Sequence, residues 1–249
     1  MSDTGDRRPL RLAIIGLGKM GRAVEALAHD RGCTVVARIG GRDNVGGSGI
    51  TPATLGGADV AIEFTEPSSA PTNIEACMEA NVPVVCGTTG WYDQLRVVAA
   101  SVERYDGALL YAPNFSVGVA VFLKAVRAAA HAARAAGGFD AHVVEVHHAA
   151  KKDAPSGTAI VVQHTAAEGL GRDVPVTSVR TGSVPGTHTL LLDGAFEQIR
   201  VEHLARDRRV FADGAITAAR WLVAQRARGG GVFTMDDVLA PPAGAEERA

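Results

Sequence analysis

Residues 145–158 combine side chains that can move protons with a helix start that can hold an anion. Their sequence is Glu-Val-His-His-Ala-Ala-Lys-Lys-Asp-Ala-Pro-Ser-Gly-Thr, so two adjacent histidines and two lysines precede a Pro-Ser-Gly-Thr turn. An unperturbed histidine titrates at about pH 6.5, and a desolvated lysine can also donate a proton near neutrality. The segment therefore predicts general-acid chemistry next to a bound anion.

The two histidines are expected at the end of a strand. Residues 141–148 alternate between β-branched and polar side chains, which is typical of a half-buried strand. Consecutive strand residues point to opposite faces, so His147 and His148 should serve different contacts. A histidine pair at a strand end can also be an ordinary polar edge, and that alternative remains open for the pair taken alone.

The anion seat is expected at the helix that follows. Ser156 precedes Gly157, Thr158 and an apolar run, which is the pattern of an N-cap opening a helix. The first turn of a helix has N–H groups without intrahelical partners and the positive end of the helix dipole, so it suits a carboxylate or phosphate. Lys151 and Lys152 add positive charge in the connecting loop, although lysines in a loop can simply be solvated.

A glycine turn near the start of the chain predicts a nucleotide site. The apolar run Leu10–Ile15 is expected to be a strand, and residues 22–28 have helical spacing. Between them lie Gly16, Leu17, Gly18, Lys19, Met20 and Gly21, which match the G-x-G-x-x-G pattern of dinucleotide-binding turns. A plain tight turn between a strand and a helix is the alternative.

The second strand bears on the choice of nucleotide. Residues 34–39 end at Gly40, where an NAD-preferring site would carry an acidic side chain for the ribose hydroxyl, and no carboxylate follows until Asp43. Arg38 and Arg42 lie nearby and could accept a 2′-phosphate. The sequence therefore slightly favours NADPH over NADH and leaves use of both open, unless the arginines are ordinary surface charges.

The first hundred residues alternate strands and helices, as a doubly wound parallel sheet does. Strands are expected at residues 60–64, 82–85 and 108–111, and a helix passes through 74–78. Ligands of such sheets lie beyond the carboxyl ends of the strands. Gly87, Thr88 and Thr89 are therefore candidate cofactor contacts, unless they form only a turn and a helix cap.

The second half of the chain has a different character and carries no nucleotide motif. A helix is expected over residues 118–136, with Lys124, Arg127, His131 and Arg134 on one solvated face. Strands of a mixed sheet are expected at 177–180, 187–192, 195–204 and 209–211, followed by a helix at 214–224 and a loose polar tail at 241–249. We therefore expect an α/β protein with a nucleotide-binding domain at 1–116 plus 217–249 and an α+β substrate domain at 117–216.

Composition excludes several classes of protein. The chain has 249 residues and a net charge of −2, so it has no general attraction to nucleic acid or anionic membranes. The first nine residues are polar, and no apolar run reaches the roughly 18 residues of a membrane helix, so a cytoplasmic protein is expected. Cys33, Cys77 and Cys86 have no C-x-x-C spacing, which argues against disulfides and a thiolate metal site.

Taken together, these motifs resemble the 4-hydroxy-tetrahydrodipicolinate reductase family of bacterial lysine biosynthesis over nearly the whole chain. The most specific match is Glu-x-His-His-x-x-Lys-x-Asp-x-Pro-Ser-Gly-Thr-Ala at 145–159. Cys-Gly-Thr-Thr-Gly at 86–90, Ala-Pro-Asn-Phe-Ser-Val-Gly at 112–118, Val-Pro-Gly-Thr-His at 184–188 and the segment 231–238 match in order as well.

The resemblance implies a Rossmann nucleotide-binding domain, NADH or NADPH as cofactor, a small dicarboxylate substrate, and a mixed-sheet domain that also forms a homotetramer. It implies that His147 and Lys151 donate protons and that His148 and the Gly157–Thr158 turn contact substrate. It further implies cofactor contacts from 87–89 and from Ala112, Pro113, Asn114 and Phe115. Metal ions are not implied.

Two positions depart from the family pattern. Some relatives carry basic residues where this chain has Ala149 and Ala150, which leaves the substrate site less positive unless Lys152 or Arg180 compensates. The other departure is the missing acid at Gly40. A reductase of another cyclic imine or enamine acid is therefore the main alternative. A non-catalytic NAD(P) sensor and a sugar-type dehydrogenase are weaker ones, because neither needs the 145–158 segment.

Overall fold

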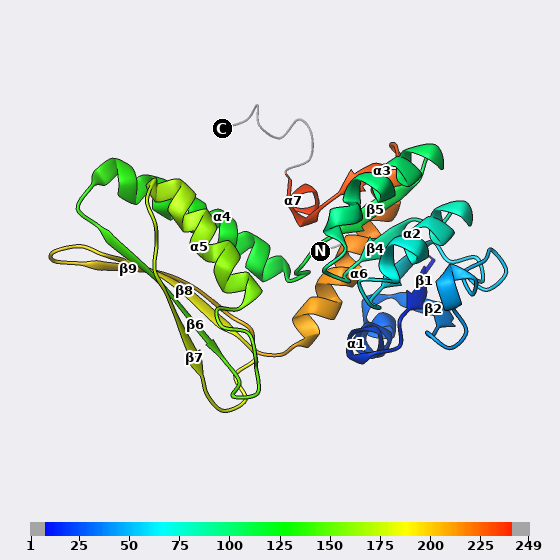
Figure 1. Ribbon diagram of the computed structural model, residues 1–249, viewed down its shortest axis with the longest axis horizontal. Helices are drawn as coiled ribbons and strands as arrows, with labels where there is room; N and C mark the ends of the chain where they lie inside the picture. The colour runs from blue at the N-terminus through cyan, green and yellow to red at the C-terminus, as the bar shows by residue number, and fades with distance from the viewer. Residues whose placement is uncertain (1–7, 241–249) are drawn as a thin grey trace. The chain divides into compact units, whose positions relative to one another are not determined.

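A six-stranded parallel sheet forms one unit of the protein in the computed structural model, which describes residues 8–240 (Figure 1). All neighbouring strands are parallel, in the order β10-β5-β4-β3-β1-β2. The strands are β1 (Leu10–Ile15), β2 (Cys33–Ile39), β3 (Val60–Glu63), β4 (Val84–Cys86), β5 (Ala108–Tyr111) and β10 (Gly231–Phe233).

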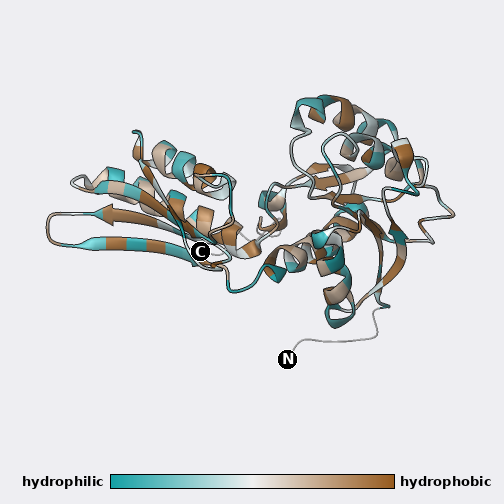
Figure 2. Ribbon diagram, turned by 60° about the horizontal axis from the view of Figure 1, so that its bottom comes forward, coloured by the Kyte–Doolittle hydropathy of each residue, from teal (hydrophilic) through white to brown (hydrophobic). Residues whose placement is uncertain are grey.

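Helices cover both faces of this sheet, which explains why its strands are almost uniformly apolar (Figure 2). Ala13 and Ile15 of β1 lie in a core with residues of α2 (Ala70–Glu79) and α3 (Leu95–Arg104). Ile14 points to the other face, where α1 (Lys19–Ala28) packs closely against it. The sheet is thus the doubly wound type that the sequence predicts.

The other unit is a mixed sheet with two long helices on one face. Its strands are β6 (Asp140–His147), β7 (Val176–Arg180), β8 (Thr187–Asp193) and β9 (Gln198–Leu204), in the order β7-β6-β8-β9. Strands β6 and β7 are parallel, and the other pairs are antiparallel. The helices α4 (Val117–Ala136) and α5 (Gly157–Leu170) bury apolar side chains against β6 and β8.

Alternation along β6 decides which side chains enter this core. Ala141, Val143, Glu145 and His147 point toward α4 and α5 and are buried, while the residues between them are half-buried. The first two pack with apolar neighbours, and the last two bring polar groups into the same layer. The period-2 pattern of the sequence therefore delivers a glutamate and a histidine side by side to the end of the core.

The division of the chain lies close to the expected one. One unit ends at Ser116 and resumes at Phe211, and the other is Val117–Val210. The unit that contains the parallel sheet thus resumes at Phe211. The sequence predicts that this second segment starts at residue 217.

Two expectations for the second half are wrong in detail, and two short elements were not expected. Residues 209–211 begin helix α6 (Arg209–Arg226) and form no strand, because the Asp207 carboxylate accepts the N–H of Arg209 and starts the helix. Strand β9 begins at Gln198, because residues 194–197 form the hairpin turn. The short strand β10 and helix α7 (Met235–Val238) were not expected, since three residues after a glycine run carry little periodicity.

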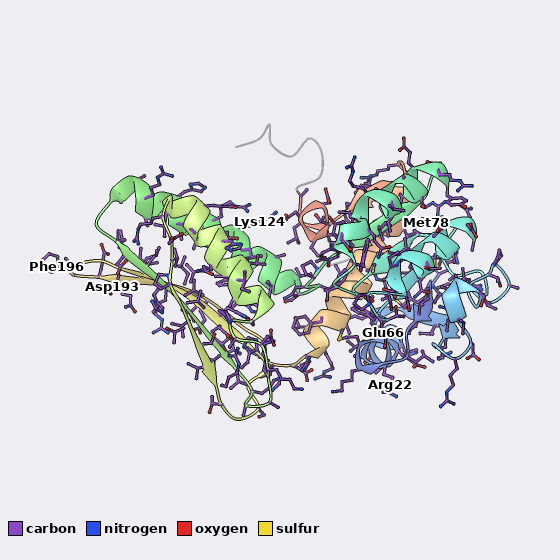
Figure 3. The ribbon with its side chains drawn as sticks, viewed as in Figure 1. Arg22, Glu66, Met78, Lys124, Asp193 and Phe196 are labelled. Carbon is purple, nitrogen blue, oxygen red and sulfur yellow. The ribbon has the colours of Figure 1, made fainter. Side chains whose placement is uncertain are left out.

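Several expectations about the surface and the cysteines are met. The charged residues of α4, including Lys124, are exposed (Figure 3). All three cysteines are free and buried. Within residues 8–240, no helix is long and apolar enough to cross a membrane. The polar tail expected at 241–249 lies outside the described residues.

Candidate active site

The glycine turn after β1 has the geometry that a dinucleotide requires. Gly16 has φ +94°, and a Cβ on it would collide with the Phe64 carbonyl. A Cβ on Gly21 would collide with the Gly16 carbonyl, so helix α1 can approach the strand only with glycine here. Gly18 faces open space and is the N-cap of α1 without a side-chain cap. The helix N-terminus is therefore accessible to a phosphate.

A cavity of about 430 Å³ lies beside this turn at the carboxyl ends of β1, β3 and β4. It is lined by Gly18, Lys19, Met20, Phe64, Thr65, Pro67, Gly87, Thr88 and Thr89. The structure therefore brings together the glycine turn and the 87–89 loop, two segments that the sequence assigned to the cofactor. Phe64, Thr65 and Pro67 also line the cavity. The sequence places this segment at the end of a strand that faces a ligand, but it assigned no cofactor contact to these residues.

A buried carboxyl group connects the loops around the cavity. Glu63, the last residue of β3, is fully buried and accepts hydrogen bonds from the Thr65 hydroxyl, the Asn73 amide and the Cys86 thiol. The Thr65 N–H in turn donates to Thr88 Oγ1 at 2.7 Å. Each of these groups is polar and satisfied within the fold, so the 64–67 and 87–89 loops are held to one another.

The remaining predicted cofactor residues are not part of the cavity wall. Ala112 and Phe115 are buried, Pro113 is exposed, and Asn114 Oδ1 accepts the N–H of Ser116 at 2.8 Å. Arg42 is exposed in the loop after β2. Their contacts with a cofactor stay predictions.

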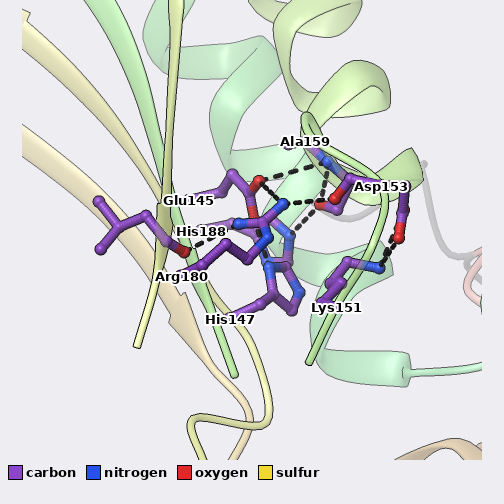
Figure 4. A network of polar contacts seen from close by, with 9 residues as sticks. Glu145, His147, Lys151, Asp153, Ala159, Arg180 and His188 are labelled. Carbon is purple, nitrogen blue, oxygen red and sulfur yellow. Dashed lines mark hydrogen bonds and ion pairs between the residues drawn. The ribbon is translucent and has the colours of Figure 1, made fainter. Parts of the chain in front are cut away.

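In the mixed-sheet unit, a buried ionic cluster surrounds the predicted proton donor His147 (Figure 4). The Glu145 carboxylate contacts His147 Nδ1 through Oε2 and accepts from Arg180 Nη2 through Oε1 at 2.6 Å. The N–H of Ser156 points at the same Oε1 at 3.3 Å. The glutamate is fully buried, and each of its oxygens has a donor.

The protonation states of this cluster follow from burial and charge. Burial alone raises the pKa of Glu145, but the hydrogen bonds to it, led by the one from Arg180, lower that pKa to about 2. Burial lowers the pKa of His147 below 6.5, and the neighbouring carboxylate offsets this only in part. At neutral pH the pair is therefore a carboxylate and a neutral imidazole. An ionised carboxylate can only accept, so Nδ1 carries the imidazole proton.

A second buried histidine connects His147 with the start of α5. The His188 ring packs edge-on against His147, with 5.1 Å between ring centroids, and its Nε2 lies 3.2 Å from Ser156 Oγ. Burial lowers the pKa of His188 to about 4, and His147 contributes to this shift when it is protonated. Ser156 Oγ also accepts the N–H of Ala159 and is the N-cap of α5, as the sequence predicts.

Gly186 leaves the other ring nitrogen of His147 accessible. It has φ +153°, and a Cβ there would lie only 3.0 Å from His147 Nε2. This explains the glycine of the Val-Pro-Gly-Thr-His motif: any side chain here would press on Nε2 of His147.

The loop between β6 and α5 holds the other predicted contacts. Lys151 Nζ donates to both carboxylate oxygens of Asp153, at 2.8 and 2.9 Å. His148 lies just past the end of β6 and is half-buried, whereas Lys152 is exposed. Gly157, at the first turn of α5, is exposed and faces open space. The structure thus collects the predicted proton donors and the predicted anion seat in one unit.

Sequence reasoning missed the residues that hold His147. Glu145 was noted only as the first residue of the 145–159 motif. Arg180 was noted for its charge, and His188 as part of the Val-Pro-Gly-Thr-His motif. Their signal was the strand alternation, which puts Glu145 on the same face as His147, together with the register of the neighbouring strands. That register pairs His147 with Arg180 and Glu145 with His188.

The cluster could also present three ligands to one metal ion. Ligand atoms of Glu145, His147 and His188 all lie within 4.8 Å of one another. However, the guanidinium of Arg180 already supplies a cation to this carboxylate, and a metal would have to displace the proton of His147 Nδ1. The arrangement therefore suits proton transfer better than metal binding.

Comparison with known proteins places this geometry in a family. Residues 10–115 match the family model "Dihydrodipicolinate reductase, N-terminus", and residues 118–239 match "Dihydrodipicolinate reductase, C-terminus". The 4-hydroxy-tetrahydrodipicolinate reductase of Christiangramia forsetii is 33% identical over 93% of this chain and 98% of its own length. That of Thiobacillus denitrificans is 36% identical over 92% and 98%.

The fold is also found in a solved structure. A dipicolinate-bound dihydrodipicolinate reductase from Paenisporosarcina superposes with a TM-score of 0.73 at 22% identity, over 91% of this chain and 97% of that one. A parallel sheet with a glycine turn, a mixed sheet with a buried histidine cluster, and both halves of the family model occur in one chain. The chain therefore belongs to the dihydrodipicolinate reductase family.

Proposed function

We propose that the protein reduces 4-hydroxy-tetrahydrodipicolinate to tetrahydrodipicolinate with NADH or NADPH, in the diaminopimelate route to lysine. The observation that carries this proposal is the buried Glu145–His147 pair next to Lys151 and the exposed start of α5. A cyclic imine with two carboxylates needs both a proton donor and an anion seat. Family membership, with relatives that bear this activity in their names, supports the same reaction.

The residues divide the work of the reaction. A bound pyridine nucleotide supplies the hydride. Loss of the 4-hydroxyl group as water gives a conjugated imine. Hydride addition to this imine leaves electron density that must take up a proton, and His147 Nε2 or Lys151 Nζ delivers it. The first turn of α5, with Ser156, Gly157 and Thr158, holds a carboxylate together with His148.

A reductase of another cyclic imine or enamine acid is the alternative. Ala149 and Ala150 are both exposed at the turn after β6 and carry no charge. A substrate with fewer or differently placed carboxylates would suit this less positive rim. The hydride and proton chemistry would be unchanged.

For the cofactor, we propose use of both nucleotides with a preference for NADPH. Arg38 is occupied by Glu25 at 2.6 Å. Arg42, by contrast, is exposed and makes no ion pair within residues 8–240. No acid stands at Gly40, where a Cβ would meet only Leu17 at 3.5 Å. Arg42 is thus available for a 2′-phosphate.

We also propose a homotetramer built on the mixed sheet. On the face opposite α4 and α5, Val179 and Leu204 are 38% and 55% exposed, and Phe196 at the β8–β9 hairpin is fully exposed (Figure 3). Apolar groups of this kind are typically covered by association. Sedimentation equilibrium should give a tetramer mass, and a monomer would contradict the proposal.

For the location of the protein, we propose the cytoplasm, whose reducing conditions fit the three free cysteines.

The reaction is tested by following absorbance at 340 nm with freshly generated 4-hydroxy-tetrahydrodipicolinate. We expect rapid oxidation of the nucleotide by the wild type. Replacement of His147 by Gln or of Lys151 by Ala should lower kcat by about 10²–10⁴-fold, because a placed general acid is lost. The affinity for NADPH should stay within about two-fold. No oxidation, with the nucleotide still bound, would favour the alternative substrate.

The pH dependence should identify the proton donor. His147 must carry a second proton to act as an acid, so activity should be lost as pH rises through its pKa. In the free enzyme that pKa lies below 6.5, whereas two bound carboxylates raise it. The limb of the kcat/KM profile should therefore lie at lower pH than the limb of the kcat profile. Both limbs should vanish in His147→Gln; their survival there would exclude His147 as the donor.

Cofactor choice is tested by the ratio of kcat/KM for NADPH to that for NADH. Arg42→Ala should lower this ratio by about ten-fold or more, since a charge-assisted contact to phosphate is lost. Gly40→Asp should lower it as well, by repelling the phosphate and binding the ribose. Arg38→Ala is the matched control and should leave the ratio unchanged. A wild-type ratio of kcat/KM in all three variants would show that the 2′-phosphate binds elsewhere.

A further inference from the structure

The guanidinium group of Arg180 contacts the two residues that hold the candidate proton donors His147 and Lys151. Arg180 is the last residue of β7 and is paired in register with His147 of β6. Its Nη2 donates to Glu145 Oε1 and to the main-chain carbonyl of Asp153, both at 2.6 Å, and its Nη1 donates to the Val179 carbonyl at 2.8 Å. The side chain is only 18% exposed (Figure 4).

Each of the two shared acceptors leads to a candidate proton donor. The Glu145 carboxylate uses its other oxygen to hold Nδ1 of His147. The residue whose carbonyl is bound, Asp153, uses its side chain to hold Nζ of Lys151. The nitrogen Nη2 of Arg180 is therefore two contacts away from His147 and from Lys151, and those two residues come from a strand and from a separate loop.

We infer that Arg180 is a positioning residue that keeps His147 and Lys151 in place relative to each other, without touching the substrate. This inference rests on the proton-donor roles proposed above. The guanidinium is always charged and has a planar fork of donors, so it can serve a carboxylate and a carbonyl at once. A lysine in its place would offer a single nitrogen and could not reach all three acceptors in the same geometry.

Loss of Arg180 should affect the surroundings of both His147 and Lys151. The buried Glu145 carboxylate would lose its counter-charge, and the loop that carries Lys151 would lose the hydrogen bond from Arg180 to its Asp153 carbonyl. Displacement of a reacting group by about 1 Å can cost about 10²-fold in rate. We therefore expect Arg180→Ala to lower kcat about 10²-fold, with NADPH affinity within about two-fold of wild type. Arg180→Lys should recover only part of that loss.

Three further results distinguish positioning from a general loss of structure. Added guanidinium ion should restore part of kcat in Arg180→Ala, and added ammonium should not. In a His147→Gln background, Arg180→Ala should cost much less than it does alone, because the donor that it positions is gone. Arg172→Ala is the matched control: Arg172 also bridges a carboxylate and a carbonyl, Asp140 and Phe139, but at the far end of β6. It should leave kcat unchanged.

A measurement without substrate separates this inference from the proposed reaction. With ¹⁵N-labelled histidine, the NMR titration of His147 reports its pKa and its tautomer. The groups that face the ring are Glu145, His188, Lys151 and Arg180. Removal of the Arg180 charge should raise the pKa of His147 and broaden or shift its Nδ1 signal, whether or not the imine is the true substrate.

Contrary outcomes are well defined. Wild-type kcat in Arg180→Ala, a loss no larger than in Arg172→Ala, or an unchanged His147 titration would each overturn the inference. If Arg180→Ala does not fold, the double variant Glu145→Gln/Arg180→Met replaces the buried ion pair by neutral groups of similar size. It should fold and remain slow; wild-type turnover by this variant would refute a positioning role for the pair.

Discussion

A buried carboxylate cannot remain ionised in a protein core unless every one of its oxygens is paired, and Glu145 imposes that requirement on the mixed-sheet unit. The partners come from three different elements: His147 from the same strand, Arg180 from the neighbouring strand, and the Ser156 N–H from the helix start. Satisfying one charge therefore fixes the strand register, the loop and the helix that together surround His147.

The nucleotide unit meets its task with backbone rather than with charge. Its turn depends on glycines that exclude side chains, and its cavity loops are held by the buried carboxyl of Glu63. A phosphate is recognised by N–H groups at a helix start, which any sequence of small residues can supply. Proton delivery, by contrast, needs particular side chains whose pKa values suit the transfer. The most specific motif of the chain accordingly lies at 145–158.

Much of this organisation could be predicted from the sequence, because it depends on local patterns. Alternation predicts β6, the glycine turn predicts the β1–α1 unit, and Ser156 predicts the start of α5. The strand proposed at 209–211 is wrong because a cap from Asp207 decides the local structure. Pairings between distant segments could not be predicted: Arg180 reaches Glu145 only through the order of strands, which alternation does not encode.

We propose that the buried carboxylate of Glu145 makes His147 a proton donor, and Glu145→Gln tests this proposal most directly. Glutamine keeps the size of the side chain but loses the charge that supports a second proton on the imidazole. We expect kcat with the cyclic imine to fall about 10²-fold or more. NADPH binding, followed by tryptophan fluorescence, should be unchanged. Wild-type turnover by the folded variant would show that the Glu145 carboxylate does not make His147 a proton donor.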